Sequence, residues 1–105
     1  MSKQYDVIIV GSGPAGISAA IELSQTPGLK VLLLEKGKDI KHRVCPGVEG
    51  GDGCRRCSPC NLVSGWGGAG AFSDGKLTLS SEVGGRLKDY IGAEKTEELV
   101  KYVDN

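Results

Sequence analysis

The sequence has no surplus of charge of either sign and no long hydrophobic run. Its 105 residues include 13 Lys or Arg and 13 Asp or Glu, whereas a nucleic-acid-binding module normally has a basic surplus. The apolar runs Val7–Val10 and Val31–Leu34 are far shorter than the roughly 20 residues of a membrane-spanning helix. Residues 1–6 lack the apolar stretch and the cleavage site of a secretory signal. These absences predict a cytoplasmic protein that binds neither nucleic acid nor membrane.

Glycine, by contrast, is plentiful. The chain has 17 glycines, and nine of them lie between Gly47 and Gly75. Glycine cannot fill a core, so this abundance predicts tight turns or places where the backbone approaches a ligand closely. From Lys41 to Asp74 no hydrophobic periodicity holds. Stretches of this length are uncommon in compact domains unless they wrap a ligand or bind a metal.

Residues 1–37 have the pattern of a parallel strand–helix–strand unit. Tyr5–Val10 has apolar residues on consecutive positions, which is typical of a strand covered on both faces. Apolar and small residues then recur at helical spacing from Ile17 to Ser24, and Lys30–Leu34 reads as a second strand. We therefore predict an α/β fold with a βαβ unit over 1–37 and a Gly- and Cys-rich loop region over 38–75. Residues 76–105 follow as a short strand at Lys76–Leu79 and a helix from Thr96.

A G-x-G-x-x-G turn joins the first predicted strand to the helix. The candidate phosphate-binding residues are Gly11, Ser12, Gly13, Pro14, Ala15 and Gly16. Glu35 ends the second predicted strand 19 residues after Gly16, and in this context the motif predicts a dinucleotide site. Amides near Gly13 and the helix N-terminus would face a pyrophosphate, while Glu35 would accept a hydrogen bond from a ribose hydroxyl. The alternative is a glycine turn without a ligand, and FAD and NAD share the motif.

Three segments together resemble a known family. They are Asp6–Gly16 (DVIIVGSGPAG), Leu33–Gly37 (LLEKG) and Ser64–Leu77 (SGWGGAGAFSDGKL). They resemble the FAD-dependent dehydrogenases, also labelled NAD(P)/FAD-dependent oxidoreductases, which have an FAD-binding domain of the glutathione-reductase type. The resemblance runs from about Tyr5 to about Tyr90.

The resemblance implies a flavin-dependent oxidoreductase with a Rossmann-like FAD-binding domain. The FAD pyrophosphate would lie on the first glycine turn, and the adenosine ribose on Glu35, next to Lys36. The second glycine segment would run beside the pyrophosphate or the isoalloxazine ring, through Gly67, Gly68, Ala69 and Gly70. A mobile linker is the alternative for that segment. The partner would be a small-molecule redox substrate or a nicotinamide nucleotide, and the resemblance assigns no catalytic residue.

Lys76, which follows the second glycine segment, has two competing interpretations. Lys76 would stabilise a reduced flavin if it lay beside the ring, or it is a solvated lysine after a turn at Asp74-Gly75. His42, between Lys41 and Arg43, is predicted to be a surface residue rather than a ligand.

Four cysteines precede the second glycine segment. Cys54, Cys57 and Cys60 form a C-x2-C-x2-C pattern, and Cys45 lies nine residues before Cys54. Thiolates at this spacing suit an iron–sulfur cluster or a structural zinc ion, and a C-x-x-C pair also suits thiol–disulfide exchange. Three readings therefore stay open: a metal or cluster site, a redox thiol pair, and inert thiols.

Two other functions compete with a flavin-binding segment. One is a fragment of an NAD-binding dehydrogenase, and the other is a non-catalytic module that binds metal through the cysteines. Two predicted strands do not make the sheet of a complete doubly wound fold. We therefore expect an incomplete domain, with the remainder of a longer flavoenzyme beyond Asn105.

Overall fold

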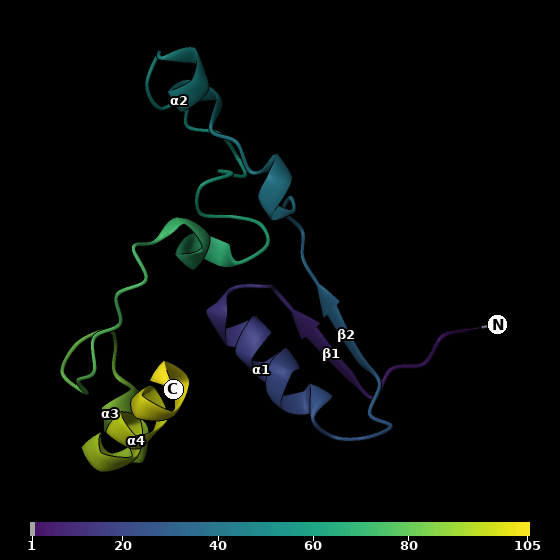
Figure 1. The fold of residues 1–105 in the computed structure, drawn as a ribbon, viewed down its shortest axis with the longest axis vertical. Coiled ribbons are helices and arrows are strands. Elements are labelled where there is room, and N and C mark those ends of the chain that lie inside the picture. Colours follow the sequence, from purple (N-terminus) through teal and green to yellow (C-terminus); the bar gives the residue numbers. More distant parts are fainter. Residues whose placement is uncertain (1) are drawn as a thin grey trace. The chain divides into compact units, whose positions relative to one another are not determined.

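The structure is a computed structural model that describes residues 2–105. The described chain divides into two compact units, residues 2–73 and residues 74–105 (Figure 1). The first unit contains the strands, and the second is helical. None of the helices in residues 2–105 is both long and apolar enough to cross a membrane.

The first unit begins with the predicted parallel βαβ arrangement. Strand β1 (Val7–Val10), helix α1 (Pro14–Ser24) and strand β2 (Val31–Leu34) follow one another, and the strands pair in parallel from Val7 with Val31 to Val10 with Leu34. Pro14 occupies the start of α1, where its missing N–H costs no intrahelical bond. This part of the structure confirms the α/β prediction and positions the glycine turn between β1 and α1.

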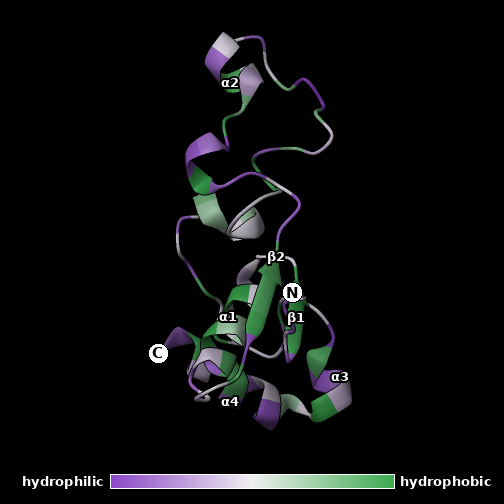
Figure 2. Cartoon of the chain, turned by 90° about the vertical axis from the view of Figure 1, so that its right-hand side faces the viewer, coloured by the Kyte–Doolittle hydropathy of each residue, from purple (hydrophilic) through white to green (hydrophobic). Residues whose placement is uncertain are grey.

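Helix α1 packs against both strands, but it covers only one face of the sheet. Along β1, Val7 and Ile9 are half-buried, whereas Ile8 is 58% exposed and Val10 is 83% exposed. Both strands are hydrophobic along their length in Figure 2. The expectation that β1 is covered on both faces is therefore wrong for this structure. A two-stranded sheet with one helix has nothing to cover its second face, and no hydrophobic residue between 2 and 105 is fully buried.

The rest of the first unit is mostly loop, as predicted, with three very short helical segments. These are the 3₁₀ turn Ile40–His42, helix α2 (Pro46–Gly50) and the 3₁₀ turn Gly68–Phe72. Gly51, in the left-handed conformation, ends α2. None of these segments is predicted by the sequence pattern, because three to five residues are too few to show a helical period.

The second unit is a pair of helices, α3 (Leu87–Ile91) and α4 (Ala93–Asp104), that contact each other. The predicted C-terminal helix is confirmed, although it begins at Ala93 rather than Thr96. The buried Thr96 hydroxyl donates to the carbonyl of Gly92 (2.8 Å).

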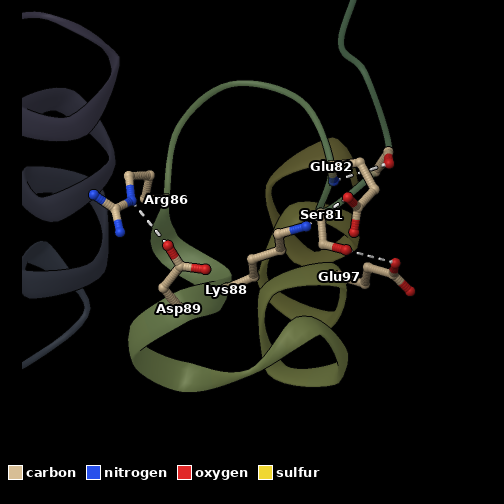
Figure 3. Close-up of polar contacts among 7 residues, drawn as sticks. Ser81, Glu82, Arg86, Lys88, Asp89 and Glu97 are labelled. Atoms are coloured by element: carbon tan, nitrogen blue, oxygen red, sulfur yellow. Dashed lines mark hydrogen bonds and ion pairs between the residues drawn. The ribbon is translucent and has the colours of Figure 1, made fainter.

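Polar contacts connect the loop before α3 to both helices (Figure 3). Ser81 is buried, and its hydroxyl donates to Glu97 on α4 over 3.1 Å. Lys88 on α3 pairs with Glu82. Arg86 pairs with Asp89 over 2.9 Å.

The predicted strand at Lys76–Leu79 is wrong, because these four described residues form neither strand nor helix. A strand needs a neighbour with which to exchange backbone hydrogen bonds. Within residues 2–105, both strands belong to the first unit and pair with each other.

Candidate functional site

The glycine turn between β1 and α1 is held to a shape that larger residues would not adopt. Gly11 has φ +100°, and its N–H donates to the carbonyl of Leu34 at the end of β2 (2.7 Å). A Cβ atom at Gly16 would lie 1.9 Å from the carbonyl oxygen of Gly11 and 3.4 Å from Cγ2 of Ile9. Glycine at position 16 therefore lets α1 pack directly against the turn and the end of β1.

The N-terminus of α1 is suited to an anion. Gly13 is the N-cap residue and makes no side-chain capping bond, and no acidic residue lies in the first turn. A Cβ atom at Gly13 would meet nothing within 4 Å. The first N–H groups of a helix carry a partial positive charge. Here an incoming phosphate can approach them without displacing a side chain.

Glu35, the residue after β2, faces this turn. Its Oε2 atom accepts hydrogen bonds from the Ser12 amide (2.9 Å) and the Ser12 hydroxyl (2.7 Å), and its Oε1 atom accepts from the Gly37 amide (2.8 Å). Ser12 is completely buried. These bonds favour the ionised carboxylate and lower the pKa of Glu35 to about 2, with the Ser12 amide as the largest cause.

The hydrogen bonds to Glu35 do not use all the acceptor positions of its carboxylate. Each carboxylate oxygen can accept about two hydrogen bonds. Ser12 uses both positions on Oε2, and Gly37 uses one on Oε1. By this count, Oε1 has one further acceptor position.

The second glycine segment lies directly against the first turn. The Gly67 amide donates to the carbonyl of Ser12 over 2.9 Å. A Cβ atom at Gly68 would lie 2.9 Å from Cα of Gly13, and one at Gly70 would lie 3.4 Å from Cγ of Pro14. The structure thus brings the two predicted glycine motifs together, although Ser12 and Gly67 lie 55 positions apart in sequence.

The two motifs and Glu35 surround a pocket of about 350 Å³, a volume within the usual range for small-molecule sites. Its lining is Val10, Gly11, Ser12, Gly13, Leu34, Glu35, Lys36, Val63, Ser64, Gly65 and Gly68. Six other predicted cofactor residues are not part of this lining: Pro14, Ala15, Gly16, Gly67, Ala69 and Gly70.

Four residues of the pocket lining were not predicted from the sequence: Val10, Leu34, Val63 and Ser64. Ser64 and Gly65 begin the second glycine segment, so the signal was present in the sequence. Val63 carries no motif, and only the fold shows its position.

The cysteines are not assembled into a metal site. All four thiols are free, with Cys54 and Cys57 exposed and Cys45 and Cys60 half-buried. Within the described part of the chain, no three His, Cys, Asp or Glu side chains are grouped as metal ligands. The structure therefore does not support an iron–sulfur cluster or a zinc ion on these residues.

The other candidate residues lie at the surface. His42 is exposed and contacts Asp39 over 2.7 Å, which confirms its prediction as a surface residue. That contact lowers the pKa of Asp39. Lys76 belongs to the second unit, is 88% exposed and pairs with Asp74 over 3.3 Å.

Taken together, a strand, a glycine turn, a helix and a parallel strand followed by an acid define a partial dinucleotide-binding fold. The chain belongs to the pyridine nucleotide-disulphide oxidoreductase family, whose model matches residues 5–72. This match covers well over half of the chain and both glycine motifs. It confirms the predicted family resemblance.

Curated relatives support the same placement. The chain is 39% identical over 94 residues to an uncharacterized protein of Clostridium beijerinckii, and the matched region covers 90% of the chain and 16% of that protein. It is 42% identical over 53 residues to a probable electron transfer flavoprotein-ubiquinone oxidoreductase of Acinetobacter baylyi (45% of the chain, 9% of that protein). It is 52% identical over 40 residues to a digeranylgeranylglycerophospholipid reductase of Picrophilus torridus (38% of the chain, 10% of that protein).

The chain thus spans about a sixth or less of the length of these relatives. No solved structure matches the chain.

Proposed function

We propose that this chain is the FAD-binding segment of a flavin-dependent oxidoreductase. The observation that carries the proposal is the meeting of three parts at one pocket: the α1 N-terminus, the carboxylate of Glu35 and the second glycine segment. The names of the relatives include a flavoprotein-ubiquinone oxidoreductase and a reductase, which agrees with this choice. The proposed binding unit is the βαβ arrangement of the first unit, and the loop residues Val63, Ser64, Gly65 and Gly68 add the second wall.

The α1 N-terminus would hold the pyrophosphate. Its first turn carries no acidic residue and no side-chain cap, and a Cβ atom at Gly13 would meet nothing within 4 Å. Backbone N–H groups at a helix start bind phosphate oxygens without a lysine or arginine. Residues Gly11–Gly16 would therefore supply shape and partial charge.

Glu35 would hold the adenosine ribose through the further acceptor position on Oε1. Because three protein N–H and O–H groups fix its carboxylate, it is pre-oriented toward the pocket rather than mobile. Its charge at neutral pH would also repel a 2′-phosphate, so the site favours nucleotides with a free ribose. Lys36 lines the same pocket and would partly balance this charge.

When bound, FAD would accept and release electrons as hydride or singly, and the protein would supply binding, orientation and electrostatics. The second glycine segment would form the wall beside the cofactor, because Gly65 and Gly68 leave no side chain between the backbone and the pocket. A small-molecule redox substrate or a nicotinamide nucleotide would be the electron partner. We further propose a cytoplasmic location, with the four cysteines as free thiols.

NAD binding is the second candidate, because the G-x-G-x-x-G turn and Glu35 suit both dinucleotides. The matched family carries pyridine nucleotide in its name. An experiment that separates the two is calorimetric titration of the full chain with FAD, FMN, NAD⁺ and NADP⁺. The proposal expects FAD to bind at least tenfold tighter than FMN, which lacks the adenosine half.

The same titration can overturn the proposal. FMN binding as tightly as FAD, or no FAD binding, would exclude it. NAD⁺ binding tighter than FAD would select the NAD alternative. A parallel titration with Zn²⁺ that shows zinc binding, without any nucleotide binding, would favour the metal module.

A further inference from the structure

Arg43 is a buried arginine that has no role in the proposed function. It directly follows the 3₁₀ turn Ile40–His42 and is only 4% exposed. Its guanidinium donates to three backbone carbonyls: Nε to Asn61 (2.7 Å), Nη2 to Leu62 (2.8 Å) and Nη1 to Trp66 (2.6 Å). One side chain thus binds the start and the middle of the loop that carries the second glycine segment.

The charge of Arg43 is compensated by dipoles and a ring rather than by an acid. None of the ion pairs found in residues 2–105 includes Arg43. Its guanidinium carbon lies 5.0 Å from the centroid of the Phe72 ring, within the range of a cation–π contact. A buried cation is costly unless it is hydrogen-bonded, so the three carbonyls must stay in place around it.

The carbonyls that Arg43 holds belong to the wall of the pocket. Between Leu62 and Trp66 lie the pocket residues Val63, Ser64 and Gly65. Gly65 fits tightly against the arginine, because a Cβ atom there would lie 2.7 Å from Cδ of Arg43 and 2.6 Å from the carbonyl oxygen of Lys38.

Two hydrogen bonds connect this clamped loop to the rest of the site. The Trp66 amide donates to the carbonyl of Lys38 (2.9 Å), and the Gly67 amide donates to the carbonyl of Ser12 (2.9 Å). Arg43 therefore fixes the loop immediately before the point where it meets the first glycine turn.

We infer that Arg43 is a positioning residue that holds the Val63–Gly65 wall against the nucleotide-binding turn. The inference rests on the proposed function for the identity of the ligand, but the arrangement of the loop is a property of the chain alone. A planar fork with several fixed donors suits this role, because it bonds three carbonyls at once, and a lysine nitrogen would not.

The test is Arg43→Met in the full chain, with Arg55→Met as the matched control. Arg55 lies in the cysteine-containing loop and pairs with the exposed Asp52. We expect Arg43→Met to speed amide hydrogen exchange at Trp66 and Gly67 at least tenfold, and to weaken FAD binding at least tenfold. We also expect it to change the visible circular dichroism of bound flavin. Arg55→Met should change none of these by more than about twofold.

Arg43→Lys guards against a variant that fails to fold. It keeps the charge and most of the aliphatic chain, but one nitrogen cannot reach three carbonyls. We expect faster amide hydrogen exchange at Trp66 and Gly67 in Arg43→Lys too. Its far-ultraviolet circular dichroism spectrum should equal that of the wild type, which would show that the variant folds. Exchange rates equal to the wild type in Arg43→Lys, or equal changes in Arg55→Met, would overturn the inference.

The two proposals fail in different ways. A wild-type chain that binds no FAD overturns the proposed function, and the exchange rates then decide the role of Arg43 independently. A wild-type chain that binds FAD, with Arg43 variants that bind it equally well, leaves the proposed function standing and excludes the positioning role.

Discussion

Two glycine-rich stretches of the same unit differ in what they contact. The second glycine segment, residues 64–70, donates hydrogen bonds to the carbonyls of Lys38 and Ser12, far away in sequence. The cysteine segment, residues 45–57, has polar contacts between near neighbours, such as Arg55 with Asp52 and the Arg56 amide with Cys54 Sγ. The second glycine segment thus contacts the pocket, whereas the polar contacts of the cysteine segment are mainly within the segment itself.

The glycines themselves show this difference. At Gly65 and Gly68 an added Cβ atom would lie within 3 Å of other parts of the unit. In the cysteine segment, a Cβ atom at Gly47 would lie 1.9 Å from the carbonyl oxygen of Gly53, which belongs to the same stretch. At Gly51 and Gly53 it would meet nothing within 4 Å, and only the positive φ angle favours glycine. Glycine abundance therefore has two physical causes here, close packing and backbone conformation. Only close packing brings backbone to the wall of a site.

The largest effect is expected from Gly65→Ala, with Gly85→Ala as its control. Both glycines have φ +123°, but Gly85 has open space around its Cβ position, whereas Gly65 faces the Lys38 carbonyl at 2.6 Å. Both variants pay a similar conformational cost, and only Gly65→Ala must also displace backbone. We expect FAD binding to weaken more than tenfold in Gly65→Ala and less than about twofold in Gly85→Ala, as measured by calorimetry.

Equal losses in both variants would mean that the positive φ angle alone explains the glycine at position 65. The contrast between the two stretches would then disappear.

Glu35→Gln should have the next largest effect. The amide keeps one acceptor oxygen but presents an N–H₂ group, so it cannot satisfy both Ser12 donors and the Gly37 amide. We expect FAD to bind about tenfold more weakly, and the preference for NAD⁺ over NADP⁺ to shrink because the repelling charge is gone. Competitive titration with the two nucleotides measures both changes.

The control for Glu35→Gln is Glu49→Gln on α2, in the cysteine segment. Glu49 is exposed and should leave FAD affinity unchanged. A loss at position 49 as large as that at position 35 would show that overall charge, rather than the pocket, controls binding.

The sequence predicted the βαβ unit because its signals are local. A strand pattern, Gly11–Gly16 and Glu35 fall within one short stretch, and each element has its own periodicity or motif. The C-terminal helix was found for the same reason. The strand at Lys76–Leu79 failed because alternation over four residues says nothing about whether a partner strand exists.

The candidate site was predicted only in part, for a different reason. The two glycine motifs are each visible in the sequence, but the hydrogen bond from Gly67 to Ser12 depends on the path of the chain between them. That path is set by Arg43, which makes three carbonyl contacts that no sequence motif announces. The cysteine spacing, in turn, suggested a metal site that the fold of that loop does not assemble.

The hydrogen bonds between Ser12 and Glu35 can be weakened by acid or by Ser12→Ala, and we expect a smaller loss of FAD affinity from this substitution than from Glu35→Gln. Since the bonds from Ser12 and Gly37 lower the pKa of Glu35 from 4.5 to about 2, their contribution to stability is fully present above pH 4.5 and is lost as pH falls toward 2. The amide resonances of Ser12 and Gly37 should therefore shift with a midpoint near 2. Ser12→Ala removes the hydroxyl bond, so the midpoint should rise, and FAD affinity should fall roughly two- to tenfold.

Titration of these amides with a midpoint near 4.5 would show that the carboxylate is not held by Ser12 in solution. Glu35→Gln provides the reference, because it should abolish the shift.

The smallest effect on flavin binding is expected from the double variant Cys54→Ser and Cys57→Ser. Both thiols are exposed and belong to the segment that contacts the pocket least, so FAD affinity should stay within about twofold of the wild type. Metal analysis and the absorption spectrum of anaerobically purified wild-type chain should show no stoichiometric zinc or iron. A loss of FAD affinity greater than tenfold, accompanied by loss of a bound metal, would join the cysteine segment to the site. The contrast between the two stretches would then describe only the chain without its metal.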